Sequence, residues 1–233
     1  MNFTFGIVTN GKDYNHLNNC IQSIYIQNIK DYEIIIIGNI DKDKVESKNK
    51  INFIDFDETI KQGWITKKKN LITQNSTYEN IVFMHDYLLL HKKWYLGFKK
   101  FGNNFDIVMN KILNPDKSRY RDWTLWPHND CFVDNIVDNN ACLLPYNVSN
   151  LSQFMYISGA YWVSKKNIMK EFPLNEDLVW GEGEDVEWSK RVRTKYDFSI
   201  NKFSTTLLQK HKNPQFTKIS RKQLNSIKKY IKN

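Results

Sequence analysis

The stretch Tyr32-Glu33-Ile34-Ile35-Ile36-Ile37-Gly38 places four consecutive isoleucines between two polar residues and a glycine. A short run of β-branched residues favours a strand over a helix. Because apolar and polar residues do not alternate in it, we expect this strand to be buried on both faces. Such strands belong to parallel sheets that helices cover on both sides. The stretch therefore predicts an α/β protein.

Strands and helices alternate along the chain on either side of this run. Short apolar runs predict strands, and apolar residues at helical spacing predict helices. The predicted strands are 3–9, 51–56, 80–84 and 105–109, and the predicted helices are 16–29, 64–74, 93–101 and 165–171. Alternation of this kind produces β-α-β units. We predict a Rossmann-like, mainly parallel central sheet flanked by helices.

The composition indicates one globular domain. The 233 residues are 41% hydrophobic, and no apolar run approaches the ~20 residues that cross a bilayer. Residues 1–8 lack the basic cluster of a secretory signal. Three cysteines, Cys20, Cys131 and Cys142, have no metal-site spacing and favour a reducing compartment. We therefore expect a soluble, cytoplasmic protein.

Four carboxylates crowd into six residues within the segment Val179-Trp180-Gly181-Glu182-Gly183-Glu184-Asp185-Val186-Glu187-Trp188. Like charges at this density repel one another, so something must offset the repulsion. A catalytic site has a use for them, because neighbouring carboxylates raise the pKa of one to the range of a base. The glycines admit a ligand close to the backbone, and the tryptophans offer flat faces for sugar rings. The alternative is an acid-rich first turn of a helix.

Polar residues follow three of the predicted strands at their carboxyl ends. They are Thr9 and Asn10 after the first strand, Asp55 to Asp57 after the third, and His85 and Asp86 after the fourth. Ligands of such sheets bind beyond the carboxyl ends of the strands. Polar residues also fall at strand ends by default, so the pattern indicates a site without proving one.

Asp86 has three interpretations from its position. It could hold a divalent metal with substrate phosphates, accept a hydrogen bond from a ribose hydroxyl, or cap its own turn. His211 lies between Lys210 and Lys212, and a single histidine there is more often structural than a metal ligand. Lysines favour phosphate binding. The run 67–70 opens a helix near the same edge, where one lysine could reach a diphosphate.

The order of these motifs resembles that of the GT-A glycosyltransferases, closest to the family-2-like and β-1,4-galactosyltransferase type. The resemblance covers about residues 3–215. Phe83-Met84-His85-Asp86 is similar to the strand that leads into that type's metal-binding Asp-x-Asp motif. Gly159 is similar to the small-residue loop under the donor sugar. Trp180-Gly181-Glu182-Gly183-Glu184-Asp185 resembles the Trp-Gly-Gly-Glu-Asp acceptor and base motif, with one residue inserted.

The resemblance implies an inverting hexosyltransferase that moves a sugar from a nucleotide-diphosphate donor, a UDP-sugar by expectation, to a hydroxyl acceptor. Asp185 would be the base and Glu184 would hold the acceptor. Further acceptor contacts would come from Trp180 and Glu182. The implied donor-binding residues are Thr9, Asn10, Asp55, Lys69, Asn70, Asp86 and Gly159. The acceptor would be a glycan, a lipid-linked molecule or a protein.

The resemblance also implies a metal site. His211 falls at the spacing of the histidine that completes the site with Asp86, and the ion would be Mn²⁺ or Mg²⁺. The sequence departs from the metal-binding motif at one position, where Leu88 replaces the second Asp of Asp-x-Asp. Either Asp86 and His211 hold the metal with the diphosphate, or Asp86 contacts only the ribose and lysines supply the charge of the metal.

The predicted glycosyltransferase domain covers residues 1–216, and residues 217–233 form a basic amphipathic helix. This helix places Ile219, Leu224, Ile227 and Ile231 on one face. It could pack on the domain, or it could contact an anionic membrane surface. The irregular segment 114–153 predicts a functional loop.

Two other functions fit the same sequence. The first is a non-catalytic carbohydrate- or nucleotide-binding module on the same fold, and the pair Glu184-Asp185 favours an enzyme over it. The second is a nucleic-acid binder, which the formal charge of +9 suggests. Only five of the 34 basic residues are arginine, and no nucleic-acid-binding motif is present. We therefore expect no nucleic-acid partner.

Overall fold

The isoleucine-rich stretch forms an inner strand of a large sheet. The computed structural model describes residues 1–47, 51–125, 141–149, 151, 154–212 and 216–228. In it, β2 (Tyr32–Gly38) pairs in parallel with β1 (Phe3–Val8) on one side and with β3 (Asn52–Asp55) on the other. All four isoleucines of β2 are buried, as expected of a strand covered on both faces.

Eight strands form this sheet, in the order β3-β2-β1-β4-β10-β6-β11-β5. The pairs β1-β4 and β6-β11 are also parallel, whereas β10 is antiparallel to both neighbours and β5 is antiparallel to β11. The remaining bounds are β4 (Asn80–His85), β5 (Leu88–Leu90), β6 (Ile107–Leu113), β10 (Tyr161–Lys165) and β11 (Phe198–Leu208). The structure confirms the predicted mainly parallel sheet flanked by helices.

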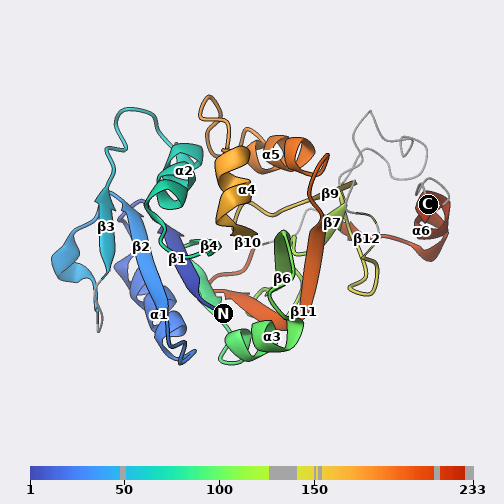
Figure 1. Cartoon of the computed structure of the whole chain (residues 1–233), viewed down its shortest axis with the longest axis horizontal. Helices are drawn as coiled ribbons and strands as arrows, with labels where there is room; N and C mark the ends of the chain where they lie inside the picture. Colours follow the sequence, from blue (N-terminus) through green and yellow to red (C-terminus); the bar gives the residue numbers. More distant parts are fainter. Residues whose placement is uncertain (48–50, 126–140, 150, 152–153, 213–215, 229–233) are drawn as a thin grey trace.

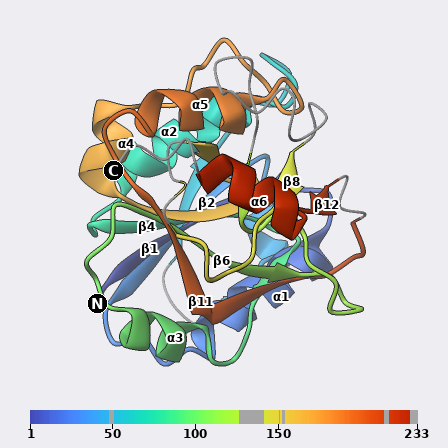
Figure 2. The same cartoon turned by 90° about the vertical axis from the view of Figure 1, so that its right-hand side faces the viewer.

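Helices cover both faces of the sheet (Figures 1 and 2). On one face lie α2 (Ile65–Asn75), α4 (Lys166–Glu171) and α5 (Glu184–Val192). On the other lie α1 (Tyr14–Tyr25) and α3 (Trp94–Phe101). This arrangement leaves one edge of the sheet, where β1, β2 and β4 end, for polar residues.

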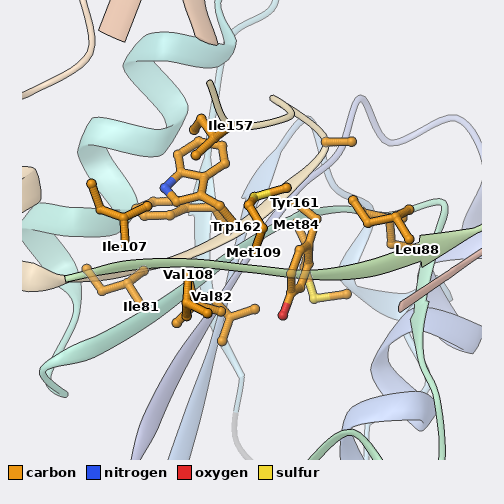
Figure 3. Close-up of a cluster of buried hydrophobic side chains, with 14 of the residues drawn as sticks. Ile81, Val82, Met84, Leu88, Ile107, Val108, Met109, Ile157, Tyr161 and Trp162 are labelled. Carbon is orange, nitrogen blue, oxygen red and sulfur yellow. The ribbon is translucent and has the colours of Figure 1, made fainter. Parts of the chain in front are cut away.

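The core fills the space between the sheet and both helix layers. Figure 3 shows the packing around Trp162 and Tyr161, which are neighbours on β10. Successive side chains of a strand point to opposite faces. Trp162 accordingly packs against Trp188 of α5, with ring centroids 5.9 Å apart, while the Tyr161 hydroxyl accepts a hydrogen bond of 2.9 Å from Trp94 of α3. One strand therefore joins the two helix layers.

A second, smaller sheet forms beside the main one. Its strands are β7 (Thr124–Leu125), β8 (Cys142–Leu143), β9 (Met155–Tyr156) and β12 (Thr217–Lys218), in the order β12-β8-β7-β9. It contains parts of the irregular middle segment, and Trp123 at its start is buried. Trp126 and Cys131 lie outside the described residues. Cys20 and Cys142 are free and buried.

Several predicted elements differ from those in the structure. The helix predicted over 16–29 is α1, which ends at Tyr25. The strand predicted over 105–109 begins at Ile107, because Phe105 packs against Phe98 and Phe101 of α3 instead of joining the ladder. The sequence analysis missed β11, whose pairing with β6 shifts register between Asn201 and Thr205. That bulge interrupts the alternation by which a strand is recognised.

The C-terminal segment begins as a strand, not as the helix predicted over 217–233. Thr217–Lys218 pairs in parallel with β8, and the Ile219 N–H donates to the Leu143 carbonyl at 3.1 Å. The helix α6 spans Arg221–Lys228. Ile219 and Leu224 pack against the hydrophobic core. Within the described residues, no helix is both long and apolar enough to span a bilayer.

We predict that deleting residues 217–233 lowers the melting temperature. The deletion removes a strand and the partly buried Ile219 and Leu224, whose packing contributes about 2 kcal/mol. For a chain of this size that free energy corresponds to roughly 4–8 °C. Differential scanning calorimetry measures the shift. Leu224→Ser should reproduce part of it, whereas Arg221→Gln, at an exposed position, should leave the melting temperature unchanged.

The membrane hypothesis for the same segment makes the opposite prediction. If residues 217–233 only adhere to anionic vesicles, the truncated protein keeps its melting temperature and loses co-sedimentation with them. That pair of results would contradict the packing described above.

Candidate functional site

A pocket of about 840 Å³ opens at the carboxyl ends of β1, β2 and β4. Thr9 and Asn10 follow β1, Asn39 follows β2 and Asp86 follows β4, and all four line the pocket. We call it the strand-end pocket. Its volume lies in the range of small-molecule and cofactor sites, and its place is where ligands bind in sheets of this kind.

Asp86 joins the turn after β4 to the turn after β1. Its carboxylate accepts a hydrogen bond of 2.6 Å from the Thr9 hydroxyl, and its own N–H donates to the Val8 carbonyl at 3.2 Å. The Thr9 hydroxyl accepts in turn from the Gly11 N–H at 3.0 Å. Burial raises the pKa of Asp86, and the bond from Thr9 opposes the shift. This carboxylate is therefore fixed in position before any ligand arrives.

Gln209 fixes the segment that follows β11 to the same place. Its N–H donates to the Tyr87 carbonyl at 3.0 Å, and its side-chain amide donates to the carbonyls of Asp86 at 3.1 Å and His16 at 2.8 Å. Lys210 and Lys212, which come next, both line the strand-end pocket. The sequence analysis gave these two lysines no individual role.

Lys212 is the better fixed of the two. Its N–H donates to the Asn114 side chain at 2.8 Å, and its Nζ lies 3.6 Å from the centroid of the Tyr87 ring. Burial, together with the positive charges of Lys210 and Arg121, lowers the pKa of Lys212 to about 8, and the negative charge of Asp86 opposes this shift. The ammonium group of Lys212 thus lies over the Tyr87 ring and near two other positively charged side chains.

His211 does not share this position. Its Nδ1 lies 3.5 Å from the Asp116 carboxylate, and the residue does not line the strand-end pocket. Leu88, at the position of the second Asp of the motif, is fully buried in β5. Within the described parts of the chain, no three potential ligands among His, Cys, Asp and Glu come together. The predicted pairing of Asp86 with His211 therefore has no support in the geometry.

The residues of the strand-end pocket do not fit a divalent metal. Mg²⁺ and Mn²⁺ prefer oxygen ligands, often one or two carboxylates with substrate phosphates. Besides Asp86, Glu58 is the other carboxylate among the lining residues, and it forms an ion pair with Lys68. Lys210 and Lys212 face the space that a cation would share with Asp86. Their positive charges disfavour a second cation there.

A second pocket, of about 680 Å³, adjoins the first. The two pockets share His85, Tyr87, Trp180 and Lys212 as lining residues, and we call this shared boundary the junction. His85 stacks on Tyr87, with ring centroids 5.2 Å apart. Burial, with the charges of Lys69 and Lys212, holds the pKa of His85 well below its usual range, so its imidazole is neutral. A ligand that reaches from one pocket into the other must pass these side chains.

The second pocket contains the carboxylate pair predicted for catalysis, and we call it the carboxylate pocket. Glu184 and Asp185 line it at the first turn of α5, after Gly183, which adopts a φ of 76°. Asp185 Oδ2 accepts a hydrogen bond of 2.8 Å from the Gly159 N–H. Burial raises the pKa of both carboxyls, and the neighbouring Asp185 raises that of Glu184 further. The acidic segment therefore forms the first turn of a helix, as one interpretation of the sequence had it. It also places two carboxyls with raised pKa values in the pocket.

A side chain at Gly159 would crowd the two carboxylates. A Cβ there would lie 3.0 Å from Asp185 Oδ2 and 3.1 Å from Glu184 Oε1. The absence of a side chain lets the backbone N–H reach the carboxylate directly. On its other side, the Gly159 carbonyl accepts a hydrogen bond of 2.8 Å from Lys69 Nζ. One glycine thus links a lysine of α2 to the acid pair of α5.

Lys69 is fully buried and does not line either pocket. Its Nζ also lies 4.5 Å from the centroid of the Trp162 ring. Burial lowers the pKa of Lys69, the charges of Glu184 and Asp185 oppose this shift, and the resulting pKa is about 8. The structure therefore places this predicted donor contact beneath the site, where its charge acts on the acid pair.

The other residues of the run 67–70 also hold the scaffold together. Lys67 forms an ion pair of 2.9 Å with Glu176, and Asn70 bonds both the Glu176 side chain and the Leu174 backbone at 2.9 Å. Lys68 lines the strand-end pocket but is paired with Glu58. The helix α2 therefore clamps the segment that precedes Trp180, and Asn70 does not reach either pocket.

The two tryptophans of the acidic segment have different roles. Trp180 is 69% exposed and lines both pockets, while Trp188 is fully buried in the core. The Trp180 N–H donates to the Gly63 carbonyl at 2.8 Å, which ties its loop to the start of α2. Glu182 accepts a hydrogen bond of 2.9 Å from the Val179 N–H and lines neither pocket.

Asp55 lies outside both pockets, in a neighbouring groove. It lines this groove with Asn39, which the groove shares with the strand-end pocket. Its carboxylate lies 3.4 Å from Lys42 Nζ. The structure therefore brings Thr9, Asn10 and Asp86 together at one pocket and Gly159, Glu184 and Asp185 at the other, with Trp180 between them.

Sequence reasoning missed further side chains that line these pockets. Arg121 and Tyr120 reach the carboxylate pocket from the irregular middle segment, and Tyr87 lines the junction. Arg121 stands 4.8 Å from the centroid of the Phe216 ring. The position of Tyr87, directly after Asp86, was a usable signal. Arg121 lies in a segment without periodicity, so its place depends on tertiary packing that no local pattern encodes.

No protein-family model and no curated protein sequence matches this chain. Solved structures do match by fold. The crystal structure of Staphylococcus aureus TarS 1–349 matches at 10% identity with a TM-score of 0.55, covering 99% of this chain and 64% of that one. Its complex with UDP matches at 10% identity and 0.56, covering 97% and 63%.

GalNAc-T7, crystallised with UDP, GalNAc and Mn²⁺, matches at 9% identity with a TM-score of 0.60. That match covers 91% of this chain and 44% of that chain, so this chain spans less than two thirds of each of these neighbours. TarS and GalNAc-T7 are glycosyltransferases. This chain is accordingly similar in fold to these glycosyltransferases.

Proposed function

We propose that this protein is a glycosyltransferase that moves a sugar from a nucleoside-diphosphate donor to a hydroxyl group of an acceptor. The observation that carries the proposal is the junction, where a pocket at the strand ends shares four lining residues with a pocket that contains a buried acid pair. The first pocket has the size and the place of a nucleotide site. The second supplies a carboxylate whose pKa burial has raised.

The neighbouring structures support UDP as the nucleotide. TarS was crystallised with UDP, and GalNAc-T7 with UDP and GalNAc. For this chain, we infer that the nucleoside occupies the strand-end pocket beside Thr9, Asn10 and Asp86. Asp86 then accepts a hydrogen bond from a ribose hydroxyl, because its carboxylate is already oriented by Thr9.

The sugar would extend from the strand-end pocket across the junction. Gly159 lines the carboxylate pocket beside the acid pair, where its N–H holds the Asp185 carboxylate in place. Trp180, exposed at the junction, offers a flat apolar face to the sugar or to the acceptor. These contacts would place the anomeric carbon near Asp185.

Asp185 is our choice for the base in a direct, inverting displacement. The acceptor oxygen attacks the anomeric carbon and loses its proton to Asp185, while the bond from that carbon to the phosphate oxygen breaks. The bond from Gly159 holds one carboxylate oxygen in place, and a raised pKa brings the group closer to the range of an effective base. Glu184 would accept a hydrogen bond from the acceptor.

Manganese is a separate question. GalNAc-T7 was crystallised with Mn²⁺, but the described residues of this chain bring no set of metal ligands together. The mechanism proposed for this protein therefore contains no step that uses a metal ion. The acceptor class, whether glycan, lipid-linked molecule or protein, and a hexosyl donor remain proposals from the resemblance.

We predict that Asp185→Asn abolishes transfer and leaves UDP affinity within a few fold. The amide keeps the shape of the carboxylate and cannot take the proton, so turnover should fall ~10²–10⁴ fold. Release of UDP from a panel of UDP-sugars measures turnover, and calorimetry measures UDP affinity. Glu187→Gln is the matched control, because Glu187 lies on the same helix, pairs with Arg191 and lines neither pocket.

The pH dependence of turnover tests the same assignment. The base must be ionised, and burial raises the pKa of Asp185. Turnover should therefore reach its maximum near neutral pH and fall, on acidification, at a higher pH than for an exposed carboxylate. Near wild-type turnover in Asp185→Asn, or a profile without this acidic limb, would contradict the assignment.

We predict that Asp86→Ala weakens the binding of uridine as well as that of UDP. A ribose contact acts on both ligands, whereas a metal bridge to the diphosphate acts on UDP alone. Isothermal titration calorimetry distinguishes the two, with Asp177→Ala as a control at an exposed carboxylate that lines neither pocket. Unchanged uridine binding would exclude the ribose contact.

A further inference from the structure

The charges that line the strand-end pocket do not balance. The pocket is lined by the lysines Lys12, Lys68, Lys210 and Lys212 and by the carboxylates Glu58 and Asp86. Lys68 is paired with Glu58, which leaves three lysines facing Asp86. Neutral His85 adds nothing to this sum. Like charges that gather in one concave place repel each other, and an anionic ligand relieves the repulsion.

Lys212 differs from an ordinary surface lysine because three contacts fix it. Its N–H is bonded to the Asn114 side chain, and its ammonium group lies over the Tyr87 ring. The preceding Gln209 bonds the turn that carries Asp86. Lys212 lines both pockets, so its charge is held at the junction. The diphosphate of a sugar donor would have to lie at this junction, between the nucleoside and the sugar.

Arg121 brings a second cation close enough to Lys212 for its charge to lower the pKa of that lysine. It lines the carboxylate pocket together with Lys212. Its guanidinium group lies 4.8 Å from the Phe216 ring centroid and 5.6 Å from that of Tyr120, which limits the directions in which it can point. Guanidinium groups bind phosphate oxygens with two parallel hydrogen bonds. The two cations come from segments far apart in the sequence.

We propose that Lys212, with Lys210 and Arg121, binds the diphosphate of the donor and takes the electrostatic place of a divalent cation. This inference rests on the proposed function and names the group that stabilises its leaving group. Leu88 is buried in β5 and His211 contacts Asp116, so the oxygen and nitrogen ligands that a cation needs are not gathered at the pocket. Lys210 and Lys212, in contrast, line the same pocket as Asp86.

The chemical step balances without a metal. When the bond between the anomeric carbon and the phosphate oxygen breaks, its electron pair stays on the diphosphate. The ammonium group of Lys212 and the guanidinium group of Arg121 donate hydrogen bonds to the oxygens that gain this charge. The proton of the acceptor hydroxyl goes to Asp185. No further reactant is needed.

Calorimetry on the full-length protein tests the proposal with UDP, uridine and inorganic pyrophosphate, each in the presence of EDTA. UDP should bind equally well within about twofold when MnCl₂ replaces EDTA. Lys212→Met should weaken UDP and pyrophosphate by about tenfold or more and leave uridine within about twofold. Lys212→Arg, which keeps the charge, should retain most of the affinity.

Lys202→Met is the matched control, because Lys202 is an exposed lysine of β11 that lines neither pocket. A melting curve for each variant shows that the fold is kept. The proposal is overturned if Mn²⁺ tightens UDP binding by about tenfold or more. It is also overturned if Lys212→Met binds UDP as well as Lys202→Met does.

The same measurements separate this inference from the proposed function. If the wild-type protein binds UDP but transfers no sugar from any donor, the function fails and the cation site stands. If UDP does not bind but pyrophosphate does, and Lys212→Met loses it, the site recognises diphosphates of another kind and the proposed donor is wrong. If neither UDP nor pyrophosphate binds in EDTA, the cation site itself is refuted.

Discussion

The candidate site depends on one buried ammonium group. Lys69 lies without exposure beneath Gly159, whose carbonyl accepts its hydrogen bond and whose N–H donates to Asp185. A buried charge is costly unless it is paired, and so is a buried acid pair. Lys69 offsets the repulsion between Glu184 and Asp185, and the two carboxylates keep Lys69 charged although burial lowers its pKa. The lysine and the acid pair therefore stabilise each other's charges across Gly159.

That dependence explains why α2 makes so many polar contacts. Lys67, Asn70 and Thr66 bind the segment from Leu174 to Leu178, which leads to Trp180 and the acid pair. A displacement of α2 would move Lys69 away from Gly159 and would also move the loop that carries Trp180. The lysine run that resembles a solvated face in the sequence is therefore internal scaffolding. Lys67 pairs with Glu176 and Lys68 pairs with Glu58, while Lys69 donates a hydrogen bond to the Gly159 carbonyl.

The sequence predicted the sheet well, because residues such as Ile34 to Ile37 determine a buried strand by themselves. It also predicted the acid pair at a helix start and the polar ends of β1 and β4, since these are local patterns. The contacts of Lys69, Asn70 and His211 could not be predicted in the same way, because a side chain of known identity can point in several directions. Whether Lys69 reaches a ligand or Gly159 depends on the packing of α2 against β1, β2 and α4. The stretch 198–208 was missed because a bulge hides its alternation.

The position of Leu88 links the fold to the electrostatics of the site. After Asp86 the chain enters β5, which pairs with β11 and buries the side chain at position 88 in the hydrophobic core. A carboxylate there would be buried in the core, away from the pocket, at a cost of several kcal/mol. Charge for a diphosphate must then come from another segment, and β11 ends beside the same turn because it is the partner of β5. Gln209 fixes that end to Asp86, and Lys210 and Lys212 follow at once. The strand that excludes a second carboxylate is thus paired with the strand that delivers the lysines.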